Sequence, residues 1–375
     1  MFKPSNFICT FLLILVNIQM ALGATTSKTQ FPHLGVYRWG APKGPAQVDT
    51  FSKWIGVADI WAEDFEPSDQ WGNVTSPTSW FFAPWQAWLK EHSGRKLILT
   101  VPMLVGAWNG SGPSTGPEAG KPVSLALGAA GAYNHYYKLL AANLISYGLG
   151  SCYIRLGHEM NGGWYTWRAS ADPKSWPLYW KQIVTTMRAV PGAHFQFVWN
   201  PASGTLQIPA EQVYPGDTYV DVIGLDLYDQ SWAPDTYPIP ANATASEKAK
   251  RRETAWNSVL LNGDHGLMFW YRFARKHHKP FAIPEWGVCN RSDGHGGGDD
   301  AAFITNMYRF MKTHQTLFDV YFDVQAGDGS HQLSPGSNGH KPIQFPKASL
   351  TFRKLFGAKL PHQLPLISSH SPSKQ

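Results

Sequence analysis

The chain has 375 residues, a formal charge of +6, only 15% charged residues and 14% aromatic residues, including 17 tryptophans. This length suffices for one large domain or two small ones. Nucleic-acid binding requires clustered basic residues, and the densest basic cluster, 248–252, is typical of a solvated helix face. We therefore expect no nucleic-acid partner.

The first 23 residues have the order of a secretory signal peptide. Lys3 precedes an apolar run over 7–16, and the small residues around Gly23 predict cleavage there. The run is too short for a membrane span and polar residues follow it, so a retained anchor helix is the less favoured alternative. We expect a secreted protein, extracellular or periplasmic, with no membrane association once residues 1–23 are removed.

The mature chain is expected to be a monomer with one catalytic domain over 24–360. Residues 361–375 are rich in Ser and Pro, which predicts a disordered tail. Two cysteines, Cys152 and Cys289, follow the signal segment. They lie at opposite ends of two predicted strands, so we expect two unpaired thiols and no disulfide framework.

Apolar and β-branched runs predict eight strands, at 34–38, 57–61, 96–101, 152–156, 194–199, 220–225, 280–284 and 319–323. Helical spacing is clearest over 130–147, 176–189, 256–277 and 301–314. Alternating strands and helices predict a parallel sheet, and eight strands are the number that closes a (β/α)8 barrel. The alternative is an open doubly wound sheet, but no glycine-rich phosphate-binding turn follows the first strand.

Two predicted strands end in a glutamate. The fourth runs into Arg155-Leu-Gly-His-Glu-Met-Asn-Gly-Gly-Trp164, which contains Glu159, and the seventh ends in Pro284-Glu-Trp-Gly287, which contains Glu285. In a parallel barrel the carboxyl ends of all strands meet on one face, so we expect the two glutamates to converge. Paired carboxylates across a sugar-sized gap are the machinery of glycoside hydrolysis, one as acid and one ionised. Taken singly, each glutamate has a structural alternative as a helix cap or a partner of arginine.

The sixth strand adds two further candidates. Period-2 alternation puts Gly224, Asp226 and Tyr228 on one face. Tyr228 either reaches the rim and hydrogen-bonds a nucleophilic carboxylate or merely packs there. Asp226 is either a site residue or a buried hydrogen-bond acceptor.

Tryptophans on strand-end loops are candidate sugar platforms, because a flat indole suits the C–H face of a pyranose ring. We predict this role for Trp164 and Trp286 and also for Trp167. Trp61, Trp108 and Trp232 are left open. In contrast, helical spacing predicts packing roles for Trp54, Trp88 and Trp180.

Competing chemistries find little support. His158 and Glu159 lack the second histidine of a His-Glu-x-x-His zinc site, so we expect no metal. No Gly-x-Ser-x-Gly motif directly follows a predicted strand, as a nucleophile elbow requires, and there is no phosphate-cradling loop, so no cofactor is expected. The glycine-rich loop 292–300, which is predicted to be mobile, follows the seventh strand on the same face of the barrel.

Four segments, in order, resemble glycoside hydrolase family 26. They are Arg155-x-x-His-Glu-Met-Asn-Gly-x-Trp164, Val198-Trp-Asn-Pro201, Asp221-Val-Ile-Gly-Leu-Asp-x-Tyr-Asp229 and Pro284-Glu-Trp-Gly287, and the similarity spans roughly 31–356. The resemblance implies a (β/α)8 barrel and a retaining double displacement. Glu159 would be the acid/base and Glu285 the nucleophile.

The same resemblance implies supporting roles around this pair. His158 would position the acid/base region, Tyr228 would steady the nucleophile, and Trp164 would line the sugar site nearest the cleavage point. Arg155 and Asp226 join the candidate binding residues. The family's commonest substrate is β-1,4-mannan, and β-1,3-xylan, mixed-linkage glucan and the producer's own exopolysaccharide stay open. A non-catalytic glycan-binding barrel is the alternative from another class.

Overall fold

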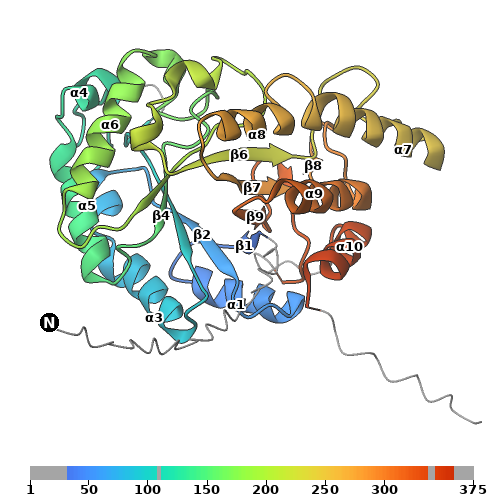
Figure 1. Ribbon diagram of the computed structural model, residues 1–375, viewed down its shortest axis with the longest axis horizontal. Helices are drawn as coiled ribbons and strands as arrows, with labels where there is room; N and C mark the ends of the chain where they lie inside the picture. Colours follow the sequence, from blue (N-terminus) through green and yellow to red (C-terminus); the bar gives the residue numbers. More distant parts are fainter. Residues whose placement is uncertain (1–31, 108–110, 337–342, 359–375) are drawn as a thin grey trace, which may run out of the picture. The chain divides into compact units, whose positions relative to one another are not determined.

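Eight parallel strands close into a barrel in the order β1-β2-β3-β4-β5-β6-β7-β9, which confirms the predicted (β/α)8 architecture (Figure 1). The computed structural model describes residues 32–107, 111–336 and 343–358. The expected signal peptide, 1–23, and the expected tail, 361–375, lie outside the described residues. None of the helices in the described ranges is long and apolar enough to cross a membrane.

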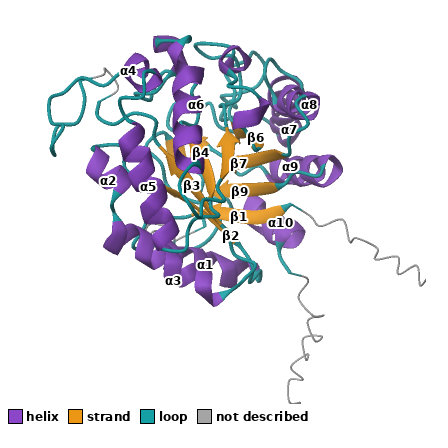
Figure 2. Ribbon diagram, turned by 60° about the vertical axis from the view of Figure 1, so that its left-hand side comes forward, coloured by secondary structure: helices purple, strands orange, loops and turns teal. Residues whose placement is uncertain are grey.

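Helices surround the central strands (Figure 2). The barrel strands are β1 (His33–Tyr37), β2 (Trp61–Phe65), β3 (Leu97–Val101), β4 (Tyr153–Leu156), β5 (Gln196–Trp199), β6 (Val222–Tyr228), β7 (Phe281–Gly287) and β9 (Phe318–Phe322). The α-helices are α1 (Gly44–Ile55), α2 (Trp71–Thr75), α3 (Ala83–Glu91), α4 (Leu125–Ala129), α5 (Asn134–Ser146), α6 (Ser175–Arg188), α7 (Ala245–Thr254), α8 (Leu267–Lys276), α9 (Ala301–His314) and α10 (Pro346–Phe356). Two short strands, β8 (Asn290–Arg291) and β10 (Gly329–Ser330), form a separate antiparallel pair.

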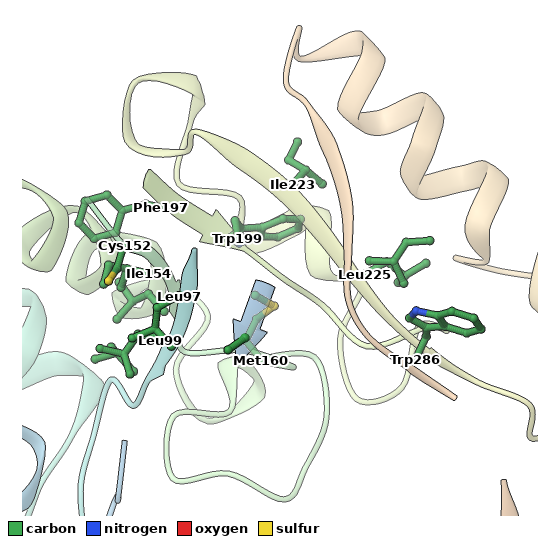
Figure 3. Packing of buried hydrophobic residues seen from close by; sticks show 14 of the residues in the cluster. Leu97, Leu99, Cys152, Ile154, Met160, Phe197, Trp199, Ile223, Leu225 and Trp286 are labelled. Atoms are coloured by element: carbon green, nitrogen blue, oxygen red, sulfur yellow. The ribbon is translucent and has the colours of Figure 1, made fainter. Parts of the chain in front are cut away.

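Alternate strand residues face two different apolar layers. Outward residues such as Leu99, Ile154 and Leu225 belong to the large core between strands and helices (Figure 3). A second cluster of inward residues, among them Ile98 and Val198, fills the barrel. Because the interior is packed with side chains, the polar groups of the site are confined to the strand ends.

The second strand begins at Trp61, where the sequence predicted it to end. Helix α1 ends at Ile55 and is capped by Gly56, whose φ of 77° is left-handed, and the residues that follow form the turn into the barrel. Trp61 therefore lies inside the barrel, with its ring 4.5 Å from that of His33. This shift also moves Glu63 from a predicted loop into the strand.

The helix predicted over 256–277 is broken in two. A π-helical segment (Ala255–Leu261) ends before α8 begins at Leu267. A Cβ on Gly263 would lie 2.3 Å from the carbonyl oxygen of Val259, so only glycine permits this tight return of the chain. By contrast, α9 starts and ends where predicted, and the Asp300 side chain caps it by accepting from the amides of Ala302 and Phe303.

Other packing predictions hold. Trp88 and Trp180 are buried and Trp54 packs against the core, stacked on Phe352. Cys152 and Cys289 are both buried, unpaired thiols.

The contact between β1 and β9 leaves no room for a side chain at Gly35. A Cβ there would lie 2.8 Å from the carbonyl oxygen of Asp319 and 3.0 Å from Cγ2 of Val320. We expect Gly35→Ala to lower the free energy of unfolding by about 1–3 kcal/mol through overpacking. Gly72→Ala is the matched control, because a Cβ on Gly72 meets nothing within 4 Å. Equal stability of the two variants in denaturant titrations would contradict this account.

Candidate active site

Three carboxylates converge at the carboxyl ends of the barrel strands. Glu159 follows β4, Asp226 lies on β6 and Glu285 lies on β7, and one oxygen of each lies within 4.8 Å of the others. The structure thus brings together the two glutamates that the sequence singled out, and adds Asp226 between them.

An irregularity in strand pairing aligns Asp226 with Glu285. The register between β6 and β7 shifts after Gly224, so that Asp226 is paired with Glu285. A Cβ on Gly224 would lie 2.8 Å from Pro284, which explains why glycine stands there. The two carboxylates are therefore neighbours on adjacent strands, both directed to the inner side.

The backbone delivers Glu159 through a strained turn. Glu159 has a φ of 51°, in the left-handed region that costs a side-chain-bearing residue about 1–2 kcal/mol. Its amide donates to the carbonyl oxygen of Asn200 at 2.7 Å. Asn161 ties the same turn to the loop after β5, donating to the carbonyl oxygens of Ala202 and Gly204 at 2.9 Å each. These bonds fix the turn and so aim the Glu159 carboxylate.

The fully buried guanidinium of Arg155 binds three carboxylates at once. Nη1 lies 2.8 Å from Oε1 of Glu63 and 2.9 Å from Oε2 of Glu285, and Nη2 contacts Asp226. Nε donates to Oδ1 of Asn200 at 2.8 Å. Arg155 does not line the cleft, so it organises the carboxylates rather than contacting substrate, and the prediction that it binds substrate directly is wrong.

Burial and mutual repulsion push the carboxyl pKa values upward. Burial, followed by the negative charge of Glu285, raises the pKa of Glu159 to about 7, although Arg155 and a hydrogen bond from Trp164 oppose the shift. Burial also raises the pKa of Glu63 to about 7 and that of Asp226 well above its usual range. Glu159 therefore keeps a proton to near neutral pH.

Two donors address the carboxylate of Glu285. The Tyr228 hydroxyl donates to Oε1 at 2.5 Å and Arg155 donates to Oε2 at 2.9 Å. Burial and the charge of Glu285 raise the pKa of Tyr228, so the hydroxyl stays protonated and remains a donor. Of the two alternatives for Tyr228, the hydrogen bond to a carboxylate is the one observed.

His158 acts through its neighbour Tyr165. Its Nε2 lies 2.8 Å from the Tyr165 hydroxyl oxygen, and the ring itself is buried away from the cleft that Tyr165 lines. Burial, with the charge of Arg155, holds the pKa of His158 well below its usual range, so the imidazole is neutral. His158 therefore holds Tyr165 in place in the wall of the cleft.

Trp167 and Trp286 were predicted to face sugars, and both predictions are wrong. Trp167 is 3% exposed and donates from Nε1 to the carbonyl oxygen of His158 at 2.9 Å. Trp286 is fully buried and donates to Oδ1 of Asp319 at 3.0 Å, and its ring packs against Phe356 of α10. The reason for Trp286 is strand alternation: Glu285 faces the site, so the next residue must face the helices.

A cleft of about 900 Å³ lies over the carboxylates. Its aromatic walls include Trp164, which is 51% exposed and donates to Oε2 of Glu159 at 2.8 Å, and Trp232, which is 56% exposed. Trp232, left open by the sequence, thus lines the site, whereas Trp108 lies outside the described residues.

Sequence reasoning missed three residues of this site: Glu63, Asn200 and Tyr165. Glu63 was missed because the predicted second strand, 57–61, ended before it. Asn200 stands in the Trp-Asn-Pro segment at the end of β5, a strand-end position that offered a usable signal.

A cation bound to the carboxylates of Glu159, Asp226 and Glu285 would lie beside the positive charge of Arg155, so the arrangement suits proton transfer better than metal binding.

The fold and the site define the class of this protein: a (β/α)8 barrel with paired carboxylates in a cleft at the carboxyl ends of its strands. Residues 151–251 match the model of "Glycosyl hydrolase family 26". Over this segment, which runs from β4 to beyond β6, the chain is similar to that family.

A curated protein and several solved structures are also similar to this chain. Over 199 residues the chain is 24% identical to Endoglucanase H of Acetivibrio thermocellus; the alignment covers 50% of this chain and 19% of that protein, so the chain spans about a fifth of its curated relative. The solved Bacillus subtilis mannanase man26 aligns with a TM-score of 0.53 and 15% identity, covering 85% of this chain and 84% of that one. A GH26 β-mannanase from Bacteroides ovatus gives 0.51 and 14%, covering 86% and 88%. These two structures share the fold.

Arg155 should be the costliest site residue to remove. We expect Arg155→Leu to lower the free energy of unfolding by about 3–5 kcal/mol near neutral pH, because it leaves several buried carboxylates without their cation. The loss should shrink as the pH falls to about 5, since without Arg155 these carboxyl pKa values rise further and protons replace the missing charge. Arg188→Leu is the control, because its partly exposed pair with Asp221 should contribute only about 0–1 kcal/mol. A pH-independent loss, measured by urea denaturation, would contradict this view.

Proposed function

We propose that this chain is a glycoside hydrolase that cleaves internal β-glycosidic bonds of a polysaccharide with retention of configuration. The observation that carries the proposal is the close approach of Glu159 and Glu285, each of which has one carboxylate oxygen within 4.8 Å of an oxygen of the other. Retaining enzymes hold their two carboxyl groups about 5–5.5 Å apart, whereas inverting enzymes need about 6.5–9.5 Å to admit a water molecule between them. The short separation supports attack by a carboxylate on the sugar.

In the first step Glu285 attacks the anomeric carbon. A bond forms from a Glu285 oxygen to that carbon, the glycosidic C–O bond breaks, and the proton of Glu159 passes to the departing oxygen. Tyr228 and Arg155 hold the two Glu285 oxygens in place for this attack. The product is a glycosyl ester on Glu285 and a shortened chain with a free hydroxyl.

In the second step a water molecule displaces Glu285 from the anomeric carbon. Esterified Glu285 carries no charge, so the repulsion that helps raise the pKa of Glu159 disappears and Glu159 becomes the ionised base. It takes a proton from water, the water oxygen bonds to the anomeric carbon, and the ester bond breaks. Two inversions leave the configuration unchanged.

The cleft supports a polymeric β-linked substrate, and we propose β-1,4-mannan. Exposed Trp164 and Trp232 offer apolar faces for sugar rings along an open surface. The named mannanase relatives support mannan, while the curated relative is named an endoglucanase. β-1,3-xylan, mixed-linkage glucan and the producer's exopolysaccharide are the other substrates for a reducing-sugar screen. Secretion, which the signal-like residues 1–23 support, and a monomeric state belong to the same proposal.

Removing either glutamate should abolish turnover. We expect Glu285→Ala and Glu159→Ala to lower kcat on mannan by at least about a thousandfold, because each step of the double displacement needs both groups. Glu159→Ala should retain more activity on an aryl glycoside whose leaving group needs no proton. Exposed Glu253→Ala is the matched control. Undiminished hydrolysis by Glu285→Ala, or an inverted product by proton NMR of wild-type hydrolysis, would sink the proposal.

The alkaline limb of the pH profile should report the proton on Glu159. With a pKa of about 7, the acid is protonated below that pH and lost above it, so kcat/KM should fall as the pH rises through about 7. Trp164→Phe removes a hydrogen bond to the ionised form, which raises the pKa and should move this limb to higher pH. Trp232→Phe, which has no bond to Glu159, should leave it in place. A limb that stays fixed or moves down in Trp164→Phe would refute the assignment.

A further inference from the structure

Three metal-ligating side chains converge beside the cleft, outside the catalytic group. Cys289 lies two residues beyond β7, and Asp328 and His331 flank β10. One donor atom of each lies within 4.8 Å of the others. Nearly forty residues separate Cys289 from Asp328 in the chain, so no sequence spacing could reveal this set.

The scaffold around the three residues is rigidly tied. Strands β8 and β10 pair through Arg291 with Gly329 and Asn290 with Ser330. The buried Tyr321 hydroxyl links both segments, accepting from the amide of Val288 at 3.2 Å and donating to the carbonyl oxygen of His331 at 2.9 Å. The fold therefore holds the segments that carry the three donors in place.

The imidazole of His331 is oriented like a metal ligand. Its Nδ1 lies 2.9 Å from the carbonyl oxygen of Val288, which can only accept, so Nδ1 carries the hydrogen. Ligating histidines almost always donate their other ring N–H to a carbonyl or carboxylate in this way. The remaining nitrogen, Nε2, faces Oδ1 of Asp328 at 3.7 Å, too far for a good hydrogen bond.

Asp328 is oriented by a second partner as well. Its Oδ2 accepts from Nη1 of Arg291 at 2.8 Å, which leaves Oδ1 directed to His331. A lone pair on Nε2 facing a carboxylate oxygen is unfavourable unless a proton or a cation lies between them. The buried sulfur of Cys289 completes the triangle on the third side.

Ligand chemistry selects the cation. Ca²⁺ and Mg²⁺ take oxygen ligands, whereas a sulfur, an imidazole nitrogen and a carboxylate oxygen together suit Zn²⁺ in tetrahedral geometry. Asp328 and His331 both line the cleft, so the cluster has an entry path from it. A fourth position would face the cleft and be filled by water.

We propose that Cys289, Asp328 and His331 form a binding site for one Zn²⁺ ion at the edge of the substrate cleft. The His331 ring lies 4.4 Å from the ring of Tyr228, centre to centre, and Tyr228 in turn bonds Glu285. The ion would fix the wall against which Tyr228 rests. This site is independent of the hydrolytic proposal, because Glu285→Ala should bind Zn²⁺ as well as the wild type does.

The test is Zn²⁺ titration calorimetry on the untagged, metal-stripped protein, with metal content counted by mass spectrometry. We expect about one Zn²⁺ per chain. Cys289→Ser and His331→Asn should weaken binding at least about a hundredfold, more than the roughly 10–100-fold typical of losing an outer partner. His331→Asn keeps an amide near the place of Nδ1, which preserves the bond to Val288. Cys152→Ser, at the distant start of β4, is the matched thiol control and should bind normally.

A measurement on the wild type guards against variants that fail to fold. Co²⁺ added to the stripped protein should give a thiolate-to-metal absorption band that Zn²⁺ displaces. Absence of that band, absence of Zn²⁺ binding by the wild type, or equal binding by the Cys289 and His331 variants would overturn the proposal. Absence of Zn²⁺ binding by the wild type would mean that a proton, and not a metal ion, lies between His331 and Asp328. Equal binding by the variants would mean that other residues hold the metal.

Discussion

The guanidinium of Arg155 is the interaction on which the rest of the site depends. It reaches Glu63 on β2, Asp226 on β6 and Glu285 on β7, and so joins opposite sides of the barrel at one charge. Several buried carboxylates with a single cation cannot all be ionised, because the low-dielectric interior penalises uncompensated charge. Burial, and after it the negative charge of Glu285, therefore keeps a proton on Glu159 to near neutral pH.

Backbone geometry sets the relative positions of Glu159, Asp226 and Glu285. The pairing irregularity after Gly224 brings Asp226 level with Glu285, and the left-handed turn at Glu159 extends its carboxylate over them. The two glutamates also have different hydrogen-bond donors: Tyr228 donates to Glu285 and Trp164 donates to Glu159. The proposed acid and the proposed nucleophile are the same residue type, and only their surroundings separate them.

The sequence predicted the barrel and the convergence of the two glutamates because both follow from strand count and strand polarity. It could not locate Glu63, because Val57, Ala58 and Ile60 made the segment before Trp61 resemble the strand, and only the turn after α1 sets the true start at Trp61. Trp286 was misassigned although alternation with Glu285 would have placed it outward. Trp167 needed knowledge of its bond to His158, which is a tertiary contact that no local pattern encodes.

The left-handed backbone of Glu159 has a consequence for the history of the chain. Glycine at this position would relieve about 1–2 kcal/mol of backbone strain, a sizeable fraction of the marginal stability of a folded domain. A lineage that used the barrel only to hold glycans would gain by losing this side chain. A glutamate thus stands at a position where stability alone favours glycine, which is the pattern expected of backbone strain at a site that performs chemistry.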